Sequence, residues 1–193
     1  MKRLNLFLTF LIVLTISSCS SDDDNRNTSN IQGELIVNGK SFELTKGFLT
    51  TYSNSSDPNR DPREFYFVLT NGDISYENNA LVLSDDITQI AEFEMYSSSE
   101  SPGSIENITY TLRDYSDQNF DYSNAYISNT GFLTNILIQD GAIISADGIG
   151  PEGMDGQVII SVNNGIYNIS FSFTSSQNTV SGSYSGILAD LNP

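Results

Sequence analysis

The sequence predicts an all-β protein, built as an antiparallel up-and-down β-barrel, with a two-sheet β-sandwich as the alternative. Apolar and polar residues alternate with a period of two through most of the chain after residue 30. Asn-Gly pairs, which accept the positive φ of a type I′ turn, separate several of these runs. Helical spacing of apolar residues is weak, and the connections are short. Sequential hairpins favour the barrel.

The first half of this region predicts a series of short strands. Leu35 and Val37 alternate with polar residues before Asn38-Gly39, and Phe42 and Leu44 do so after it, which predicts a hairpin. A second tight turn is expected at Asn71-Gly72, pairing the strands on either side of it. The strands expected here span residues 47–52, 64–70, 74–76, 80–83, 90–96 and 105–112.

The middle of the chain is less regular. Residues 113–131 are polar and aromatic, and we expect an irregular excursion with a short strand at 125–127. A strand at 132–138 is then expected to turn at Asp140-Gly141 into a strand at 142–145. Four glycines and a proline make residues 147–156 a predicted loop.

The C-terminal third has the clearest pattern. Apolar residues alternate with polar ones from residue 158 to 162, and Asn164-Gly165 follows. Every second residue of the next run is apolar or aromatic, and the same holds for the run after a polar turn at 175–178. This predicts a three-stranded meander with one wet and one dry face. The dry-face residues after Gly165 are Tyr167, Ile169, Phe171, Phe173, Val180, Tyr184 and Leu188.

The first 18 residues are typical of a bacterial export signal. Lys2 and Arg3 precede an apolar run over residues 4–16, about 20 Å long as a helix, which is too short for a bilayer core of about 30 Å. Ile16-Ser17-Ser18-Cys19 resembles the bacterial lipobox, which implies cleavage before Cys19 and lipidation of its thiol. An ordinary secretory signal with an incidental cysteine is the alternative.

The residues after Cys19 are acidic and polar. Ser20, Ser21, Asp22, Asp23 and Asp24 resemble the export signal of Bacteroidetes surface lipoproteins, which directs a protein across the outer membrane. The alternative is that these acidic residues are only the solvated first part of a tether, without a role in export. We therefore expect a flexible tether at 19–30, one all-β domain at 31–193, and lipid anchoring in the outer membrane, facing outward.

Composition excludes several functions. The formal charge of −16 repels nucleic acid, so we expect no nucleic-acid partner and only the lipid as a membrane contact. The chain has no histidine, which removes Ser-His-Asp and Cys-His catalysis and the commonest zinc ligand. Glycoside hydrolysis needs two carboxylates at a fixed separation. With 24 acidic residues in the chain, some pair meets this requirement by chance, so the sequence gives no evidence for that activity. We expect no enzymatic activity and no cofactor.

Motifs at both ends of the domain resemble a known group. Val37-Asn38-Gly39-Lys40-Ser41-Phe42-Glu43-Leu44 stands at the start, and Gly165-Ile166-Tyr167-Asn168-Ile169-Ser170-Phe171 and Val180-Ser181-Gly182-Ser183-Tyr184-Ser185-Gly186 stand near the end. With the lipobox and the Asp run, they resemble Bacteroidetes surface lipoproteins with a lipocalin-like, or calycin-like, β-barrel. The resemblance implies a barrel and supplies no catalytic residues.

One acidic loop partly matches a calcium-binding pattern. Asp117, Asn119 and Asp121 have the alternating spacing of the first three ligand positions of an EF-hand loop. Tyr122 stands where that loop needs glycine, and Ser128 stands where it needs a bidentate glutamate. The sequence therefore predicts at most a weak Ca²⁺ site, and otherwise turn residues that cap their own backbone.

Four aromatic residues fall outside clear strand alternation: Tyr115, Phe120, Tyr122 and Tyr126. We expect them to be exposed and to contact a ligand. The first functional hypothesis is a non-catalytic ligand-binding barrel, which needs an unfilled interior for an apolar small molecule. The second is a glycan-binding or adhesive module using loops 53–62 and 113–126. The third is a protein-binding inhibitor or a structural lipoprotein.

Overall fold

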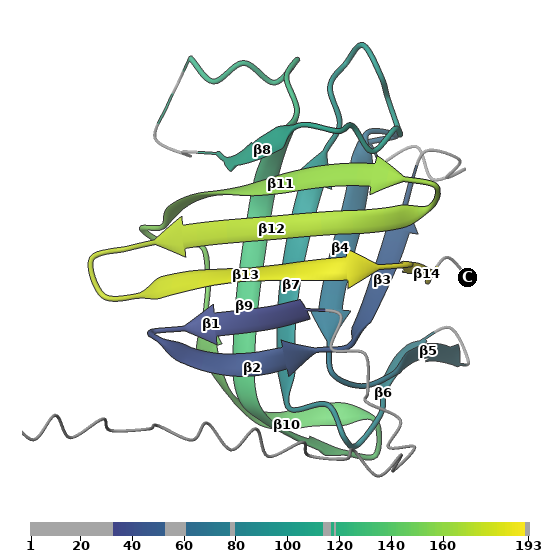
Figure 1. Cartoon of the computed structure of the whole chain (residues 1–193), viewed down its shortest axis with the longest axis vertical. Coiled ribbons are helices and arrows are strands. Elements are labelled where there is room, and N and C mark those ends of the chain that lie inside the picture. Colours follow the sequence, from purple (N-terminus) through teal and green to yellow (C-terminus); the bar gives the residue numbers. More distant parts are fainter. Residues whose placement is uncertain (1–32, 53–60, 78–79, 114–116, 118, 192–193) are drawn as a thin grey trace, which may run out of the picture.

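The computed structural model describes residues 33–52, 61–77, 80–113, 117 and 119–191 (Figure 1). Cys19 and the export-signal residues Ser20, Ser21, Asp22, Asp23 and Asp24 lie outside the described residues, as does Tyr115. Within the described part of the chain, no helix is long and apolar enough to span a membrane.

The described chain is all-β. Its strands are β1 (Gly33–Val37), β2 (Lys40–Leu44), β3 (Lys46–Thr51), β4 (Glu64–Thr70), β5 (Ile74–Glu77), β6 (Ala80–Leu83), β7 (Gln89–Tyr96), β8 (Thr109–Leu112), β9 (Tyr126–Gln139), β10 (Ala142–Ile149), β11 (Asp155–Asn163), β12 (Ile166–Thr174), β13 (Thr179–Gly186) and β14 (Ala189–Asp190).

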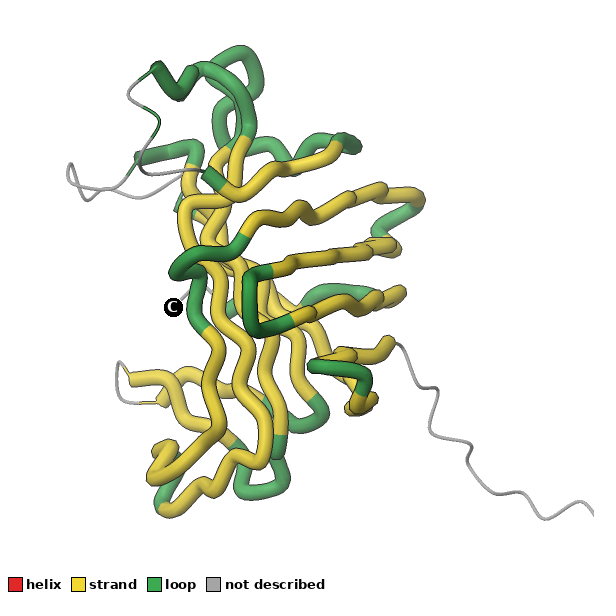
Figure 2. Tube along the Cα trace, turned by 90° about the vertical axis from the view of Figure 1, so that its left-hand side faces the viewer, coloured by secondary structure: helices red, strands yellow, loops and turns green. Residues whose placement is uncertain are grey.

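One continuous sheet contains almost all of these strands. Its order is β14-β3-β4-β7-β9-β8-β11-β12-β13-β1-β2, with β10 paired to β9 off this path and β5-β6 forming a separate pair. The sheet curls through 298° into an open half-barrel. Strands β11, β12 and β13 cross over β3, β4, β7 and β9, so that two parts of the same sheet face each other (Figures 1 and 2).

The prediction of a closed up-and-down barrel is therefore wrong. In such a barrel each strand pairs with its neighbours in the sequence, whereas β7 pairs with β9 and skips β8. Strand β8 lies parallel to β9, and β14 lies parallel to β3, so the sheet is mixed. The alternative of two separate sheets is not observed either, because β8 links the two crossing parts into one sheet.

The tight turns were predicted well, with one exception. Asn38-Gly39, Asp140-Gly141 and Asn164-Gly165 all have positive φ and close the hairpins expected there. Asn71-Gly72 does not close a hairpin, because β5 pairs with β6 and not with β4. The Asn71 carboxamide instead accepts a hydrogen bond from the Thr88 backbone N–H at 2.9 Å and donates one to the Asp86 carbonyl at 3.1 Å.

Aromatic side chains fill the space between the two crossing parts of the sheet. Phe93 is fully buried, and its ring lies 5.1 Å from that of Phe171, 5.8 Å from that of Phe132 and 6.1 Å from that of Phe173. The C-terminal meander of β11, β12 and β13 supplies the dry face that the sequence predicts. The core also contains Leu35, Leu44, Phe65, Phe67, Tyr110, Val158, Ile160 and Tyr184.

A second, smaller core lies on the opposite face of β4, β7 and β9. Phe48, Ile90 and Ile136 pack there against Ile74 of β5 and Ile87. This cluster covers the part of that face near Thr70 and Gln89. Towards the other end of the same strands the face carries polar and aromatic side chains, and the candidate site lies there.

Candidate functional site

The alternation of β7 decides which residues reach the site. Phe93 and Met95 point into the core, so Glu92, Glu94 and Tyr96 point to the opposite face. Tyr96 pairs with Tyr126, the first residue of β9. The two tyrosine rings stack with centroids 4.8 Å apart and an interplanar angle of 3°. They form the base of an aromatic cluster at the end of the sheet.

The loop before β9 adds two more rings to this base. The Phe120 ring lies 5.2 Å from that of Tyr126 and 5.1 Å from that of Tyr122, both edge-to-face. The Tyr122 ring meets that of Tyr126 edge-on at 5.9 Å. Offset and edge-to-face contacts of this kind are the favoured arrangements of aromatic side chains. We call Tyr96, Phe120, Tyr122 and Tyr126, together with Arg113, the aromatic cluster.

Arg113 joins the cluster directly after β8. Its backbone N–H donates to the Ile127 carbonyl at 2.9 Å, which continues the parallel pairing of β8 with β9. The guanidinium carbon lies 4.6 Å from the Tyr122 ring centroid and 5.7 Å from that of Phe120. Both distances are within the range of cation–π attraction. Arg113 therefore orders the two rings that the loop contributes.

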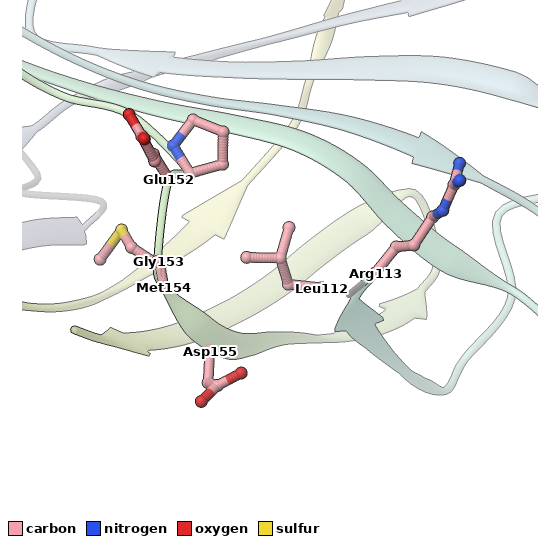
Figure 3. Close-up of a pocket in the computed structure, with 7 residues that line it drawn as sticks. Leu112, Arg113, Glu152, Gly153, Met154 and Asp155 are labelled. Atoms are coloured by element: carbon pink, nitrogen blue, oxygen red, sulfur yellow. The ribbon is translucent and has the colours of Figure 1, made fainter. Parts of the chain in front are cut away.

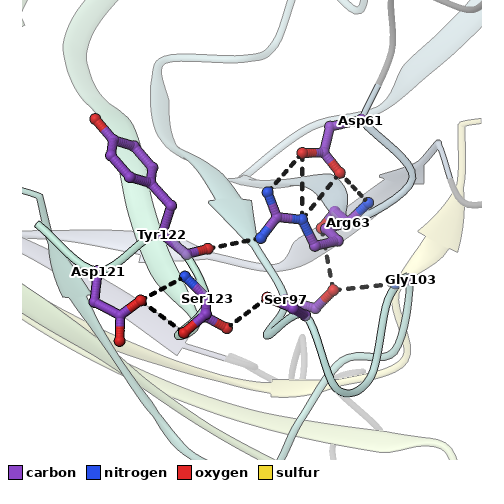
Figure 4. Close-up of polar contacts among 8 residues, drawn as sticks. Asp61, Arg63, Ser97, Gly103, Asp121, Tyr122 and Ser123 are labelled. Atoms are coloured by element: carbon purple, nitrogen blue, oxygen red, sulfur yellow. Dashed lines mark hydrogen bonds and ion pairs between the residues drawn. The ribbon is translucent and has the colours of Figure 1, made fainter.

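Arg63, in the loop before β4, fixes the backbone of Tyr122 by a hydrogen bond (Figure 4). Its Nη1 donates to the Tyr122 carbonyl at 2.7 Å, while Nη2 donates to Asp61 Oδ2 at 2.7 Å. The Ser97 N–H donates to the Arg63 carbonyl at 3.0 Å, and the Ser99 N–H donates to the Ser123 carbonyl at 2.8 Å. Three loops are thereby tied together around the aromatic cluster.

The ionisation of these groups is set by their contacts. The hydrogen bond from the Arg63 side chain lowers the pKa of Asp61, and the same bond raises the pKa of Arg63. Burial raises the pKa of Tyr96 and of Tyr126 above the ordinary value for tyrosine. Near neutral pH the Tyr96 and Tyr126 phenols are thus neutral, and the neighbouring Asp61 and Arg63 compensate each other's charge.

The acidic residues considered for calcium cap their own loop. Asp117 Oδ1 accepts from the Asn119 N–H at 2.9 Å, and Asp121 Oδ1 accepts from the Ser123 N–H at 2.9 Å. Hydrogen bonds from Ser123 lower the pKa of Asp121. Within the described residues, no three His, Cys, Asp or Glu side chains lie together in a way that could hold a metal ion. The geometry seen here is turn capping.

A separate hollow of about 540 Å³ opens beside the end of β8 (Figure 3). Leu112 and Met154 provide apolar surface. Glu152 of the loop between β10 and β11 and Asp155, the first residue of β11, extend in different directions. Arg113 borders this hollow, although its guanidinium is in contact with the Phe120 and Tyr122 rings. Among the residues that the structure describes, none of those lining the hollow is aromatic.

The structure thus gathers three of the four predicted aromatic residues in one place. Tyr122 is 45% exposed, as expected, whereas Tyr126 is buried at 6% because Tyr96 and Phe120 cover it. Sequence reasoning missed Tyr96 and Arg113. The position of Tyr96 could have been predicted from the alternation of the strand, because Tyr96 follows Glu92 and Glu94 at steps of two residues and therefore lies on the same outer face. Arg113 has none, because its position depends on the parallel pairing of β8.

Comparison of the chain with protein-family models, with curated protein sequences and with solved structures finds no match.

Proposed function

We propose that the protein is a non-catalytic, lipid-anchored surface protein that binds glycans through the aromatic cluster. The observation that carries this proposal is the exposed ring of Tyr122, held between Arg113 and Tyr126 at the end of the sheet. An aromatic ring offers the flat apolar surface on which the C–H face of a sugar ring packs. A ring whose backbone and neighbours are fixed loses little entropy on binding.

The filled interior supports a surface site over an interior one. Phe93, Phe132, Phe171 and Phe173 occupy the space in which a barrel would hold an apolar ligand. Residues 53–60 of the first loop expected to bind glycans lie outside the described residues. The end of that loop, at Asp61, is joined through Arg63 to Tyr122 of the second loop. This favours the second of the three hypotheses over the interior-binding first.

The anchoring part of the proposal depends on the sequence alone. The lipobox-like residues 16–19 and the acidic residues 22–24 are its support. An outward-facing lipid anchor would expose the domain to extracellular polysaccharide. Mass spectrometry of the mature protein from a bacterial host tests this part: we expect an acylated Cys19 at the N-terminus, and an unmodified chain that keeps residues 1–18 would contradict it.

Binding is tested with the full-length protein, purified in detergent and screened against immobilised glycans. We expect wild type to bind at least one glycan class and Tyr122→Ala to weaken that binding about tenfold or more, since one aromatic contact and its buried area contribute on the order of 1.4 kcal/mol. Tyr76→Ala is the matched control, because Tyr76 is similarly exposed but lies on β5. Equal binding by Tyr122→Ala and wild type would refute the site.

A further inference from the structure

Another hollow, with polar side chains in its lining, lies on the same face as the aromatic cluster. Its volume is about 70 Å³, and its lining includes Tyr66 of β4, Glu92 and Glu94 of β7, and Asn129 and Thr130 of β9. Glu92 lies over Gly131, where an added Cβ would meet its Oε1 at 2.5 Å. The absence of a side chain at Gly131 therefore makes room for this carboxylate on the sheet surface.

The strand register places the hollow beside the aromatic cluster. Tyr66 pairs with Glu94, and Glu94 pairs with Asn129, so these three residues form one row across the sheet. The next row along the strands contains Tyr96 and Tyr126. With about 4.8 Å between strands and about 6.8 Å between alternate residues, Tyr66 and Tyr126 are about 12 Å apart at the backbone. That span exceeds one sugar ring.

The side chains of the hollow suit hydroxyl groups. The carboxylates of Glu92 and Glu94 accept hydrogen bonds, and the Asn129 carboxamide both donates and accepts. The Tyr52 ring meets that of Tyr66 edge-on at 6.0 Å, and a hydrogen bond to Glu64 fixes the Tyr66 hydroxyl. An oriented tyrosine beside polar acceptors offers a sugar both a ring surface and hydrogen-bond partners.

The charge of the hollow limits the ligand. Burial and the neighbouring Glu94 raise the pKa of Glu92, although its side chain still reaches solvent. Neither glutamate forms an ion pair within the described part of the chain. A polymer of uronic acids would bring further carboxylates next to these two and would be repelled. Next to the aromatic cluster, Asp61 compensates the charge of Arg63, while the Arg113 guanidinium within the cluster lies over the Phe120 and Tyr122 rings.

We infer that the ligand is a neutral polysaccharide chain that lies across both places, with one sugar on Tyr122 and another over the hollow at Tyr66, Glu94 and Asn129. This inference rests on the proposed function and names the ligand class of the same face. Two linked contacts make binding stronger for a chain that reaches both than for a short one that reaches only one.

The experiment measures the affinity of the full-length protein for neutral oligosaccharides of two to six sugars and for a uronic acid polymer. For wild type we expect about tenfold or greater tightening with length, because the second contact becomes intramolecular, and no binding of the uronic acid polymer. Glu94→Gln combined with Asn129→Ala should abolish the gain with length and leave disaccharide binding intact. Glu77→Gln, on the separate β5-β6 pair, is the control.

The possible failures are distinguishable. If affinity is independent of length, or the Glu94/Asn129 variant keeps the full gain, the second contact is refuted while glycan binding at Tyr122 stands. If wild type binds the uronic acid polymer as tightly as neutral chains, the charge argument is refuted. Absence of binding to every glycan overturns both this inference and the proposed function.

Discussion

Replacing Arg63 with Met removes the contact that joins the three loops of the site and keeps most of the side-chain volume. Arg63 donates to both Asp61 oxygens and to the Tyr122 carbonyl, and the Arg63 and Asp61 side chains are only 20% and 33% exposed. Hydrogen bonds to charged groups contribute about 1.5–3 kcal/mol each, and partial exposure reduces that. We expect Arg63→Met to lower the free energy of unfolding by about 1–3 kcal/mol.

For a domain of this size, such a loss lowers Tm by roughly 3–8 °C, which calorimetry or circular dichroism can measure. Lys46→Met is the matched control, because it breaks the Lys46–Asp73 ion pair, whose side chains are 47% and 72% exposed. Exposed pairs contribute about 0–1 kcal/mol, so the control should lower Tm much less. Equal Tm losses in the two variants would refute the role of Arg63 in joining the loops.

The same contact makes stability depend on pH. Because the Arg63 hydrogen bond lowers the folded-state pKa of Asp61, its stabilisation is fully present above the unfolded pKa of about 4 and is lost as pH falls through the folded value. The Tm difference between wild type and Arg63→Met should therefore be constant from pH 5 to 8 and shrink below about pH 4. A difference that persists unchanged into stronger acid would contradict this assignment.

Two further substitutions and one titration test the fold. Phe93→Ala should lower the free energy of unfolding, measured in urea, by about 3–5 kcal/mol, because a fully buried ring is lost. A loss below about 1 kcal/mol would contradict the filled interior. Gly182→Ala should cost about 1–3 kcal/mol, since its Cβ would lie 2.3 Å from the Glu34 carbonyl oxygen, whereas Gly150→Ala, with open space, should be neutral or slightly stabilising. In a spectrophotometric titration, Tyr110, with a pKa raised by burial to about 12, should ionise well above the ordinary value for tyrosine; ionisation near pH 10 in the folded protein would refute its burial.

Local patterns in the sequence predicted local structure correctly. The hairpins at Asn38-Gly39 and Asn164-Gly165 and the meander of β11, β12 and β13 follow from turn chemistry and alternation, which act over a few residues. Phe120 and Tyr122 were found because they broke that alternation. The aromatic cluster could thus be predicted in part before its geometry was known.

Pairing between distant strands could not be predicted in this way. The strand expected at 105–112 begins only at Thr109, because the Glu106 N–H donates to the Tyr110 hydroxyl and holds a turn before it. Strand β9 continues unbroken through Asn129 and Gly131, which interrupt its apolar pattern, because β7 pairs with it along that stretch. The open, mixed sheet and the place of Arg113 depend on these long-range contacts.

Nuclear magnetic resonance of the protein titrated with a neutral oligosaccharide tests glycan binding on this face most directly. Glycan binding as proposed predicts chemical-shift changes concentrated at Tyr122, Phe120 and Arg113, extending to Asn129 as the oligosaccharide lengthens. Shifts confined to the loop at Pro151 and Glu152, or no shifts with any neutral oligosaccharide, would contradict it.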